Sequence, residues 1–370
     1  MTARLRVVVA GMVAGVANQG GAAWAVLQWA LGAHRLGHDV VVLEELGPAS
    51  ASSPAALGDI LGDLRLPLSW HAYRAGARTE PSDEREATGL IRNADLVINL
   101  AGTCRLRALD APRRSVFVDL DPAYTQAWHA EGIDLGIDRH SHHATVGLAL
   151  GATQCKVPLL GRRWMHTLPP VDLPSWPAGA DPPRWMLTTV ANWRSYGSVS
   201  IGGVICGQKA HALRPLATLP RRSAIPIELA LAIDTRETGD IAMLQTNRWH
   251  LVDPGVRAGR ASDYRHYVSS SAGEFGLAKE GYVASRCGWF SDRSACYLAA
   301  GRPTVIADTG AGDVLAHEGI LRFSSLDEAV EAIEQLATSY HSHARGARHF
   351  AEAQLDATVV VGRLIEEVMS

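Results

Sequence analysis

The strongest constraint on the fold is the proline-rich stretch LPPVDLPSWPAGADPP at residues 168–183. Proline has no N–H donor and a fixed φ, so neither a helix nor an interior strand can run through this stretch. The chain has 370 residues, and single hydrophobic cores stop growing at about 250–300 residues. We therefore predict two domains, at residues 1–168 and 184–370, joined by a semi-rigid linker at residues 169–183.

Both halves begin with a short apolar strand and continue with alternating helices and strands. In the first half, apolar runs at residues 5–10 and 40–43 flank a predicted helix at residues 22–36, and another strand follows at residues 95–100. The pattern restarts after the linker with residues 184–190 (RWMLTTV). Continuous apolar strands separated by helices indicate parallel sheets with helices on both faces. The predicted class is α/β.

The composition is that of a globular protein with few special constraints. The net charge is −3, so we see no overall cationic footprint and expect no nucleic-acid partner. The five cysteines are scattered and never form a CxxC pair, which is typical of reduced cytosolic thiols. No convincing signal peptide and no apolar run of membrane-spanning length is present. These features predict a cytoplasmic location.

Residues 269–310 contain the most informative local pattern. Residues 287–292 read as a loop, residues 292–300 as a short helix, and residues 304–307 as a buried strand. Ser291 or Asp292 is a suitable N-cap, and Gly301 ends the helix where a left-handed residue is needed. A glycine-flanked loop that leads into a helix N-terminus favours anion binding, because free N–H groups and the helix dipole point at the same place.

This segment resembles the donor-binding segment of GT-B glycosyltransferases, in which a loop and helix hold the diphosphate and sugar of a nucleotide-sugar. The matching runs are Gly288 with Ser291–Arg293, then residues 298–303 (LAAGRP), then residues 308–310 (DTG). The chain departs from the family pattern, because a pair of glutamates with seven residues between them cannot be placed. Glu274 and Glu280 are too close together. The subfamily therefore stays open.

The resemblance implies two Rossmann-like domains facing a central cleft, with the donor held mainly by the C-terminal domain. It also implies a cation pair at the start of that domain, and Arg194 and Lys209 match in type and order. Arginine offers a bidentate fork and lysine a point charge for phosphate oxygens. The donor site implied by the resemblance consists of Arg194, Lys209, Gly288, Ser291, Asp292, Arg293, Asp308, Thr309 and Gly310.

The first glycine-rich loop, at residues 11–21, does not contain a correctly spaced GxGxxG, so dinucleotide binding is not expected. In GT-B enzymes this loop often faces the cleft and shapes the acceptor site. The resemblance therefore implies that Asn18, Gln19 and Gly20 lie on the acceptor side. The alternative is that these glycines only make a tight turn.

Three residues are candidates for the base that removes the acceptor proton. Asp119 and Asp121 follow an apolar strand, and strand ends face the ligand crevice in open α/β sheets. His140 belongs to the run DRHSHH, which otherwise reads as a polar surface turn. The same aspartates are also what a metal-dependent glycosyltransferase would use for a divalent ion. We expect no metal, because the two-domain pattern favours the other fold.

The sequence therefore predicts transfer of a sugar from a nucleoside diphosphate sugar to an acceptor, expected to be a small molecule. No cofactor is expected beyond this co-substrate. Three alternatives remain open: a nucleotide-sugar epimerase or hydrolase of the same shape, a metal-dependent glycosyltransferase using Asp119 and Asp121, and a non-enzymatic nucleotide-sugar binding subunit. The oligomeric state, the sugar and the nucleotide base do not follow from the sequence.

Overall fold

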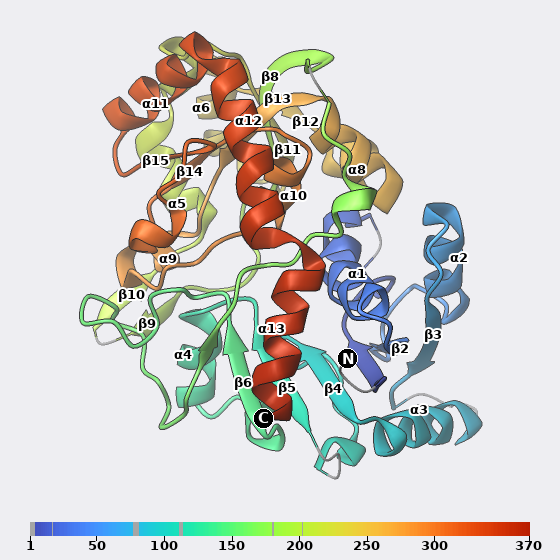
Figure 1. Ribbon diagram of the computed structural model, residues 1–370. Helices are drawn as coiled ribbons and strands as arrows, with labels where there is room; N and C mark the ends of the chain where they lie inside the picture. Colours follow the sequence, from blue (N-terminus) through green and yellow to red (C-terminus); the bar gives the residue numbers. More distant parts are fainter. Residues whose placement is uncertain (1–3, 17, 77–80, 111–113, 180, 202) are drawn as a thin grey trace.

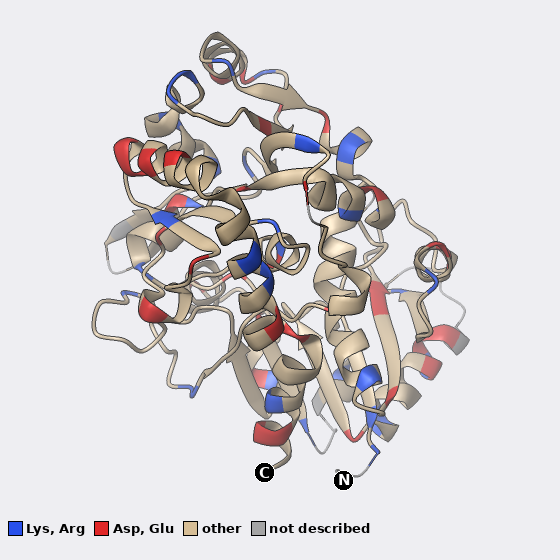
Figure 2. Cartoon of the chain, turned by 45° about the horizontal axis from the view of Figure 1, so that its top comes forward, with Lys and Arg blue, Asp and Glu red and all other residues tan. Residues whose placement is uncertain are grey.

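The computed structural model describes residues 4–16, 18–76, 81–110, 114–179, 181–201 and 203–370. Two sheets, each covered by helices, form the lower and upper parts of the view in Figure 1. In Figure 2, basic and acidic residues are interspersed over both parts. Among the described residues, no helix is both long and apolar enough to cross a membrane.

The first sheet has seven parallel strands in the order β3-β2-β1-β4-β5-β6-β7. The order reverses between β1 and β4, so ligands are expected beyond the carboxyl ends of these two strands. The strands are β1 (Arg6–Ala10), β2 (Asp39–Leu46), β3 (Ser69–Arg74), β4 (Leu96–Leu100), β5 (Ser115–Asp119), β6 (His142–Thr145) and β7 (Met165–His166). The helices are α1 (Gly20–Arg35), α2 (Ala55–Leu64), α3 (Pro81–Asn93) and α4 (Tyr124–Ala130).

The second sheet has six parallel strands in the order β12-β11-β8-β13-β14-β15. Its strands are β8 (Arg184–Asn192), β11 (Ile227–Ala232), β12 (His250–Val252), β13 (Ser271–Gly276), β14 (Thr304–Ala307) and β15 (Ile320–Phe323), with a separate hairpin of β9 (Val199–Ile201) and β10 (Val204–Cys206). Its helices are α5 (Lys209–Leu213), α6 (Thr238–Thr246), α7 (Pro254–Ala258), α8 (Ala261–Ser270), α9 (Glu280–Ser285), α10 (Asp292–Ala299), α11 (Leu326–Thr338) and α12 (Tyr340–Phe350). The predicted class, α/β with two Rossmann-like domains, is confirmed.

The predicted loop, helix and strand after residue 287 form as expected. Ser291 caps α10, and its hydroxyl accepts a hydrogen bond from the backbone N–H of Arg293 at 3.2 Å. Gly301 adopts φ +71°, a value that glycine reaches without strain, and β14 begins three residues later. Local capping and turn chemistry therefore place the start of α10 at the carboxyl edge of the second sheet.

The last helix, α13 (Ala357–Met369), is an exception to the predicted division of the chain, because it crosses back to the first sheet and packs on α1 (Figure 1). Gly32 of α1 allows this contact, since a Cβ there would lie 2.6 Å from the carbonyl oxygen of Ala357. The proline-rich stretch crosses beside it, and Val171 exchanges backbone hydrogen bonds with Leu355 and Ala357 at 2.7 and 2.9 Å. Residue 180 of the predicted linker lies outside the described residues.

The start of α1 touches the second domain directly. Trp24 donates its indole N–H to the carbonyl of Ala261 at 2.8 Å, and its ring meets that of Trp176 edge-on at 5.2 Å. Gly20 faces the backbone of Arg260 so closely that a Cβ would collide with it. This contact places the first loop of the N-terminal domain opposite the carboxyl edge of the second sheet.

Candidate functional site

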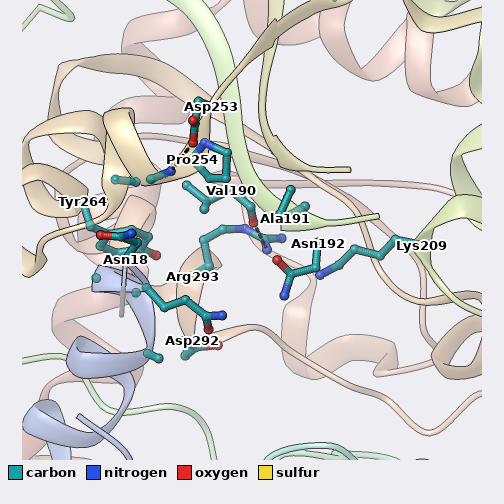
Figure 3. A pocket seen from close by; sticks show the side chains of 17 residues that line it. Asn18, Val190, Ala191, Asn192, Lys209, Asp253, Pro254, Tyr264, Asp292 and Arg293 are labelled. Atoms are coloured by element: carbon teal, nitrogen blue, oxygen red, sulfur yellow. Dashed lines mark hydrogen bonds between the residues drawn. The ribbon is translucent and has the colours of Figure 1, made fainter. Parts of the chain in front are cut away.

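A pocket of about 420 Å³ lies between the two domains, where the carboxyl ends of both sheets face each other. Figure 3 shows Lys209 and Arg293 extending from opposite sides of this pocket towards Asn192. The lining residues come from the start of α1, the end of β8, α5, α7, α8 and the start of α10. We call it the interdomain pocket. Open α/β sheets bind ligands beyond the carboxyl ends of their strands, and the interdomain pocket lies at this edge of both sheets.

Arg293 is a buried cation in the wall of the pocket, with 7% of its surface exposed. Its Nε donates to Oε1 of Glu274 at 2.6 Å, and its Nη1 donates to the carbonyl of Val190 at 3.0 Å. Its Nη2 has no hydrogen-bond partner among the described residues. Because buried donors are nearly always satisfied, this arrangement leaves a pre-oriented N–H group for an anionic ligand.

Lys209 is the second cation of the pocket and the first residue of α5. Burial, and then the charge of Arg293, lower the pKa of Lys209 to about 8. Within the described part of the chain, its ammonium group forms neither a hydrogen bond nor a salt bridge. Arg293 disfavours the charged form of Lys209, whereas Asp292 and Glu274 favour it without forming a direct ion pair with Lys209. An anion bound between the two cations would stabilise the charge of both.

The α10 N-terminus contributes a hydroxyl cap and a carboxyl group to the same region. The Ser291 side chain is occupied by its capping bond, whereas Asp292 lines the pocket. Burial raises the pKa of the Asp292 carboxyl, against the opposing charges of Arg293 and Lys209. A carboxylate does not bind phosphate, so Asp292 is suited to accept hydrogen bonds from hydroxyl groups next to a bound anion.

Several other residues predicted for the donor site do not line the pocket. Arg194 is half-exposed and pairs with Glu237, its Nε lying 2.5 Å from Oε1. Gly288 has φ +74°, and a Cβ there would lie 2.5 Å from the backbone N of Ala149 in the other domain. Its role is close packing at the domain contact.

The run at residues 308–310 supports the loop at residues 286–290. The Asp308 carboxylate accepts from the N–H of Gly310 at 3.0 Å, and the Thr309 hydroxyl donates to the carbonyl of Trp289 at 2.7 Å. Gly310 has φ +92° and packs on Arg286. These residues stabilise the turn after β14 and do not line the interdomain pocket.

Asn18, Gln19 and Gly20 do line the interdomain pocket. The same three residues border a second pocket of about 270 Å³, which is also lined by the first loop, by α2 with the carboxylates of Asp59 and Asp63, and by residues 259–262 of the C-terminal domain. The first loop therefore lies between two pockets, and each of them has walls from both domains.

Glu44, which the sequence did not reveal, holds the first loop in place. Its buried carboxylate accepts hydrogen bonds from the backbone N–H groups of Val13, Ala14 and Gly15 at 2.7–3.0 Å. Burial raises the pKa of Glu44 and these hydrogen bonds oppose the rise. Three consecutive N–H groups around one carboxylate form an anion nest inside the protein.

Asp119, the first candidate for the base, is fully buried beneath the turn that follows β5. Its carboxylate accepts from the hydroxyls of Thr125 and Thr145, the amide of Gln126 and the backbone N–H of Asp121, at 2.7–3.0 Å. It does not line the interdomain pocket. The structure gives Asp119 the task of shaping the turn that carries Asp121.

Asp121 and His140 also lie outside the pocket lining. Asp121 forms a salt bridge with Lys279 of the other domain at 2.8 Å. His140 is buried, and its ring nitrogens meet the carbonyl of Gly136 at 2.8 Å and the amide of Asn99 at 3.1 Å. Burial lowers the pKa of His140 to about 4. The reading of this run as a surface turn is wrong, because His140 is enclosed and His142 begins β6.

The arrangement of His, Cys, Asp and Glu side chains bears on the metal-dependent alternative. Among the residues that the structure describes, no three His, Cys, Asp or Glu side chains are grouped in a way that could hold a metal ion. Both carboxylate oxygens of Asp119 accept hydrogen bonds from protein groups.

Comparison with known proteins identifies structural relatives only. No protein-family model matches the chain, and no curated protein matches its sequence. Among solved structures, an α-glucosyltransferase in complex with UDP and a 13-mer DNA containing an HMU base matches with a TM-score of 0.64 and 11% identity, over 100% of both chains. The avilamycin biosynthesis glycosyltransferase AviGT4 matches with a TM-score of 0.59 and 13% identity, over 99% of this chain and 97% of that one.

A UDP-forming α,α-trehalose-phosphate synthase from Burkholderia xenovorans matches with a TM-score of 0.52 and 11% identity, over 99% of both chains. These identities establish a shared fold. They also overturn one expectation, because a protein that matches over its whole length was solved with DNA bound beside UDP. The exclusion of nucleic acid, and with it the restriction to a small-molecule acceptor, does not stand.

Proposed function

Since the chain has the GT-B fold, we propose that it is a glycosyltransferase that moves a sugar from a nucleoside diphosphate sugar to an acceptor hydroxyl. The observation that carries this proposal is the pair of cations in the interdomain pocket, Lys209 and Arg293, whose buried Nη2 group has no hydrogen-bond partner among the described residues. Both lie at the carboxyl edge of the second sheet, where a diphosphate has two cations and a helix N-terminus around it.

In this proposal Arg293 and Lys209 hold the diphosphate and stabilise the charge that develops on it as the sugar leaves. Arg293 is fixed by Glu274, so it offers its remaining N–H groups without reorganising. Lys209 supplies a point charge from the other side of Asn192 (Figure 3). Charge-assisted hydrogen bonds of this kind contribute about 1.5–3 kcal/mol each.

The nucleoside is proposed to occupy the end of the pocket that is formed by α7 and β11. That end is lined by Ala232, Pro254 and Ala258, which offer apolar surface for a base. Asp292 is proposed to accept a hydrogen bond from a hydroxyl of the transferred sugar, because its carboxyl lies beside the cations without being able to bind phosphate itself.

We propose that no divalent metal takes part, since two cations and the start of α10 already surround the diphosphate position. Activity should then survive EDTA. Complete loss with EDTA and recovery with Mn²⁺ or Mg²⁺ would contradict this part of the proposal.

We also place the protein in the cytoplasm, and the five free cysteines support this location because reduced thiols persist there.

Calorimetric titration with UDP, GDP and dTDP, followed by assays of sugar release from the matching donor, tests the function. Release should be slow with water alone and faster with a true acceptor. Acceptor panels should include hydroxyl-bearing DNA, because an α-glucosyltransferase of this fold was solved with DNA. The absence of binding to all three nucleotides would overturn the proposal, and fast release that no acceptor stimulates would indicate a hydrolase.

A further inference from the structure

Five side chains from both domains form one cluster beside the interdomain pocket, and we call it the closure cluster. Asp121 and Tyr124 come from the N-terminal domain, at the end of β5 and the start of α4. Tyr196, Lys279 and Tyr282 come from three segments of the C-terminal domain, after β8, before α9 and within α9. The cluster is the polar centre of a largely apolar contact between the domains.

Every side-chain donor that reaches the Asp121 carboxylate comes across the domain boundary, among the described residues. The Lys279 ammonium group donates at 2.8 Å and the Tyr282 hydroxyl at 2.5 Å, and the Tyr196 hydroxyl donates as well. Charged and hydroxyl donors form strong hydrogen bonds to a carboxylate. The Asp121 side chain keeps 23% of its surface exposed, and it has these three donors only while the two domains are in contact.

The Lys279 ammonium group is enclosed by aromatic rings. It lies 4.1 Å from the ring centre of Tyr196, 4.6 Å from that of Tyr124 and 5.3 Å from that of Tyr282. Burial lowers the pKa of Lys279, and the neighbouring Asp121 carboxylate acts against this change. Ring faces and one carboxylate therefore replace the water that the cation would have if the domains separated.

The cluster is connected to Lys209 through the two residues before it. The Tyr124 hydroxyl donates to the carbonyl of Gly207, and the N–H of Gly281 donates to the same carbonyl at 3.1 Å. This carbonyl lies two residues before Lys209, so α4 of the N-terminal domain and α9 of the C-terminal domain jointly fix the segment that carries it.

The Gln208 side chain makes a second connection. Its Oε1 accepts from the N–H of Ser195 at 3.4 Å, and its Nε2 donates to the carbonyl of Gly197 at 3.2 Å. These two bonds hold the loop on either side of Tyr196. The contact between Tyr196 and Asp121 is therefore coupled, through one buried glutamine, to the residue next to Lys209.

We propose that Asp121 is a positioning residue that links closure of the two domains to the placement of Lys209. Closure brings Asp121 and Tyr124 against the segments around Gly207 and Lys279, and the diphosphate site is complete only in that state. This inference rests on the proposed function for the identity of the anion. It assigns Asp121 a role other than that of a base, because three donors already occupy its carboxylate.

The test is the variant Asp121→Asn, with Asp134→Asn as the matched control. Asp134 also accepts hydrogen bonds, from Arg139 and from the N–H of Gly136, but all three residues lie within the N-terminal domain. Asp121→Asn should weaken UDP binding about tenfold and leave uridine binding unchanged, since a charge-assisted bond contributes enough for such a change. Asp134→Asn should change neither affinity.

Small-angle scattering of the ligand-free proteins supplies the second measurement. Asp121→Asn should have a larger radius of gyration than the wild type and Asp134→Asn. If Asp121→Asn does not fold, Tyr282→Phe removes one donor while keeping the ring and should show the same changes to a smaller extent. A radius of gyration equal to that of the wild type in Asp121→Asn, or in Tyr282→Phe where it replaces Asp121→Asn, overturns the inference. Loss of turnover in Asp121→Asn with unchanged UDP affinity also overturns it, because that result would indicate that Asp121 is a base.

The two proposals fail separately in this design. If the wild type binds no nucleoside diphosphate, the proposed function fails and the scattering comparison still decides the role of Asp121. If the wild type binds UDP and Asp121→Asn binds it equally well, only the role of Asp121 is wrong.

Discussion

At the scale of single residues, diphosphate binding is expected to depend on two cations that line the same pocket, Lys209 and Arg293. The Nε of Arg293 donates to Glu274, and its buried Nη2 has no hydrogen-bond partner among the described residues. Lys209 has no salt bridge to a described residue, and its pKa falls to about 8. A bound diphosphate would stabilise the charged form of Lys209 and raise this pKa again.

UDP binding should therefore weaken above pH 8. In the free protein Lys209 loses its proton around that pH, whereas the bound state keeps it, so binding takes up a proton. We expect the dissociation constant to rise by up to about tenfold per pH unit above pH 8, measured by calorimetry in buffers of different ionisation enthalpy. Lys209→Arg should abolish this dependence, because arginine stays charged. A flat profile in the wild type would contradict the low pKa.

The same group affects stability with the opposite sign. The unfolded chain keeps the ordinary lysine pKa of 10.5, so it binds more protons than the folded protein between about pH 8 and 10.5. The contribution of Lys209 to the free energy of unfolding therefore increases with pH in that window.

Residue types and local order were sufficient to predict the cap Ser291 and to select Lys209 and Arg293, both of which line the interdomain pocket. Their binding of a diphosphate stays a prediction. The same signals did not predict Glu274 as the partner of Arg293. Glu274 lies on β13, which pairs with β14, and this packing brings its carboxylate to the Arg293 Nε. Arg194 has the residue type of a phosphate ligand, but Glu237 of α6 neutralises it in space. Whether a cation is free to bind a ligand therefore depends on acidic side chains that are distant in the sequence, as Glu237 is from Arg194.

At the scale of elements, the first loop should depend on the Glu44 carboxylate. Glu44→Gln replaces one oxygen with an N–H₂ group, which faces backbone N–H donors. We expect a loss of about 1–3 kcal/mol in the free energy of unfolding, because buried donors are left unsatisfied. Amide hydrogen exchange of residues 11–20 should become faster.

Glu45→Gln is the control for this prediction. Glu45 is the next residue of β2, and it accepts from the Tyr73 hydroxyl and the N–H of Arg105, away from the first loop. Equal exchange rates at residues 11–20 in Glu44→Gln and Glu45→Gln would show that Glu44 does not hold the loop.

The contact between α1 and α13 gives a second prediction at this scale. Gly32→Ala should destabilise the protein by about 1–3 kcal/mol, because the new methyl group would meet the backbone of Ala357. Gly62→Ala, on the exposed side of α2, should stabilise it by about 0.5–1 kcal/mol, since nothing lies within 4 Å and alanine favours helices. Denaturant unfolding measures both, and stabilisation by both variants would contradict the α1–α13 contact.

Elements with strong local signals were predictable from the sequence. The run from Ser291 to Ala307 carries its own cap, its glycine turn and its apolar strand, and the structure reproduces it. β13 was not predicted, because SAGEFG has weak strand propensity and is buried by its neighbours. The packing of α13 on the first domain was not predictable from its own residues, because an apolar helix face could pack on either domain.

At the scale of the whole molecule, the proline-rich stretch is more tightly held than a free linker. Trp176 is fully buried against Trp24 and Tyr264, and Val171 bonds to the segment before α13. Proteinase K should therefore cut residues 168–177 slowly under native conditions. Mass spectrometry of early fragments checks this, and a dominant early fragment that ends within that range would contradict the packing.

The proposed function requires that the interdomain pocket binds a nucleoside diphosphate through Lys209 and Arg293. Titration calorimetry of Lys209→Ala with UDP and with uridine tests it most directly, with Arg194→Ala as a control cation outside the pocket. UDP binding should weaken by about tenfold or more in Lys209→Ala, since about 1.4 kcal/mol corresponds to tenfold. Uridine binding should change little in Lys209→Ala, and both affinities should stay near the wild type in Arg194→Ala. Equal losses for UDP and uridine, or no loss for either, would contradict the claim.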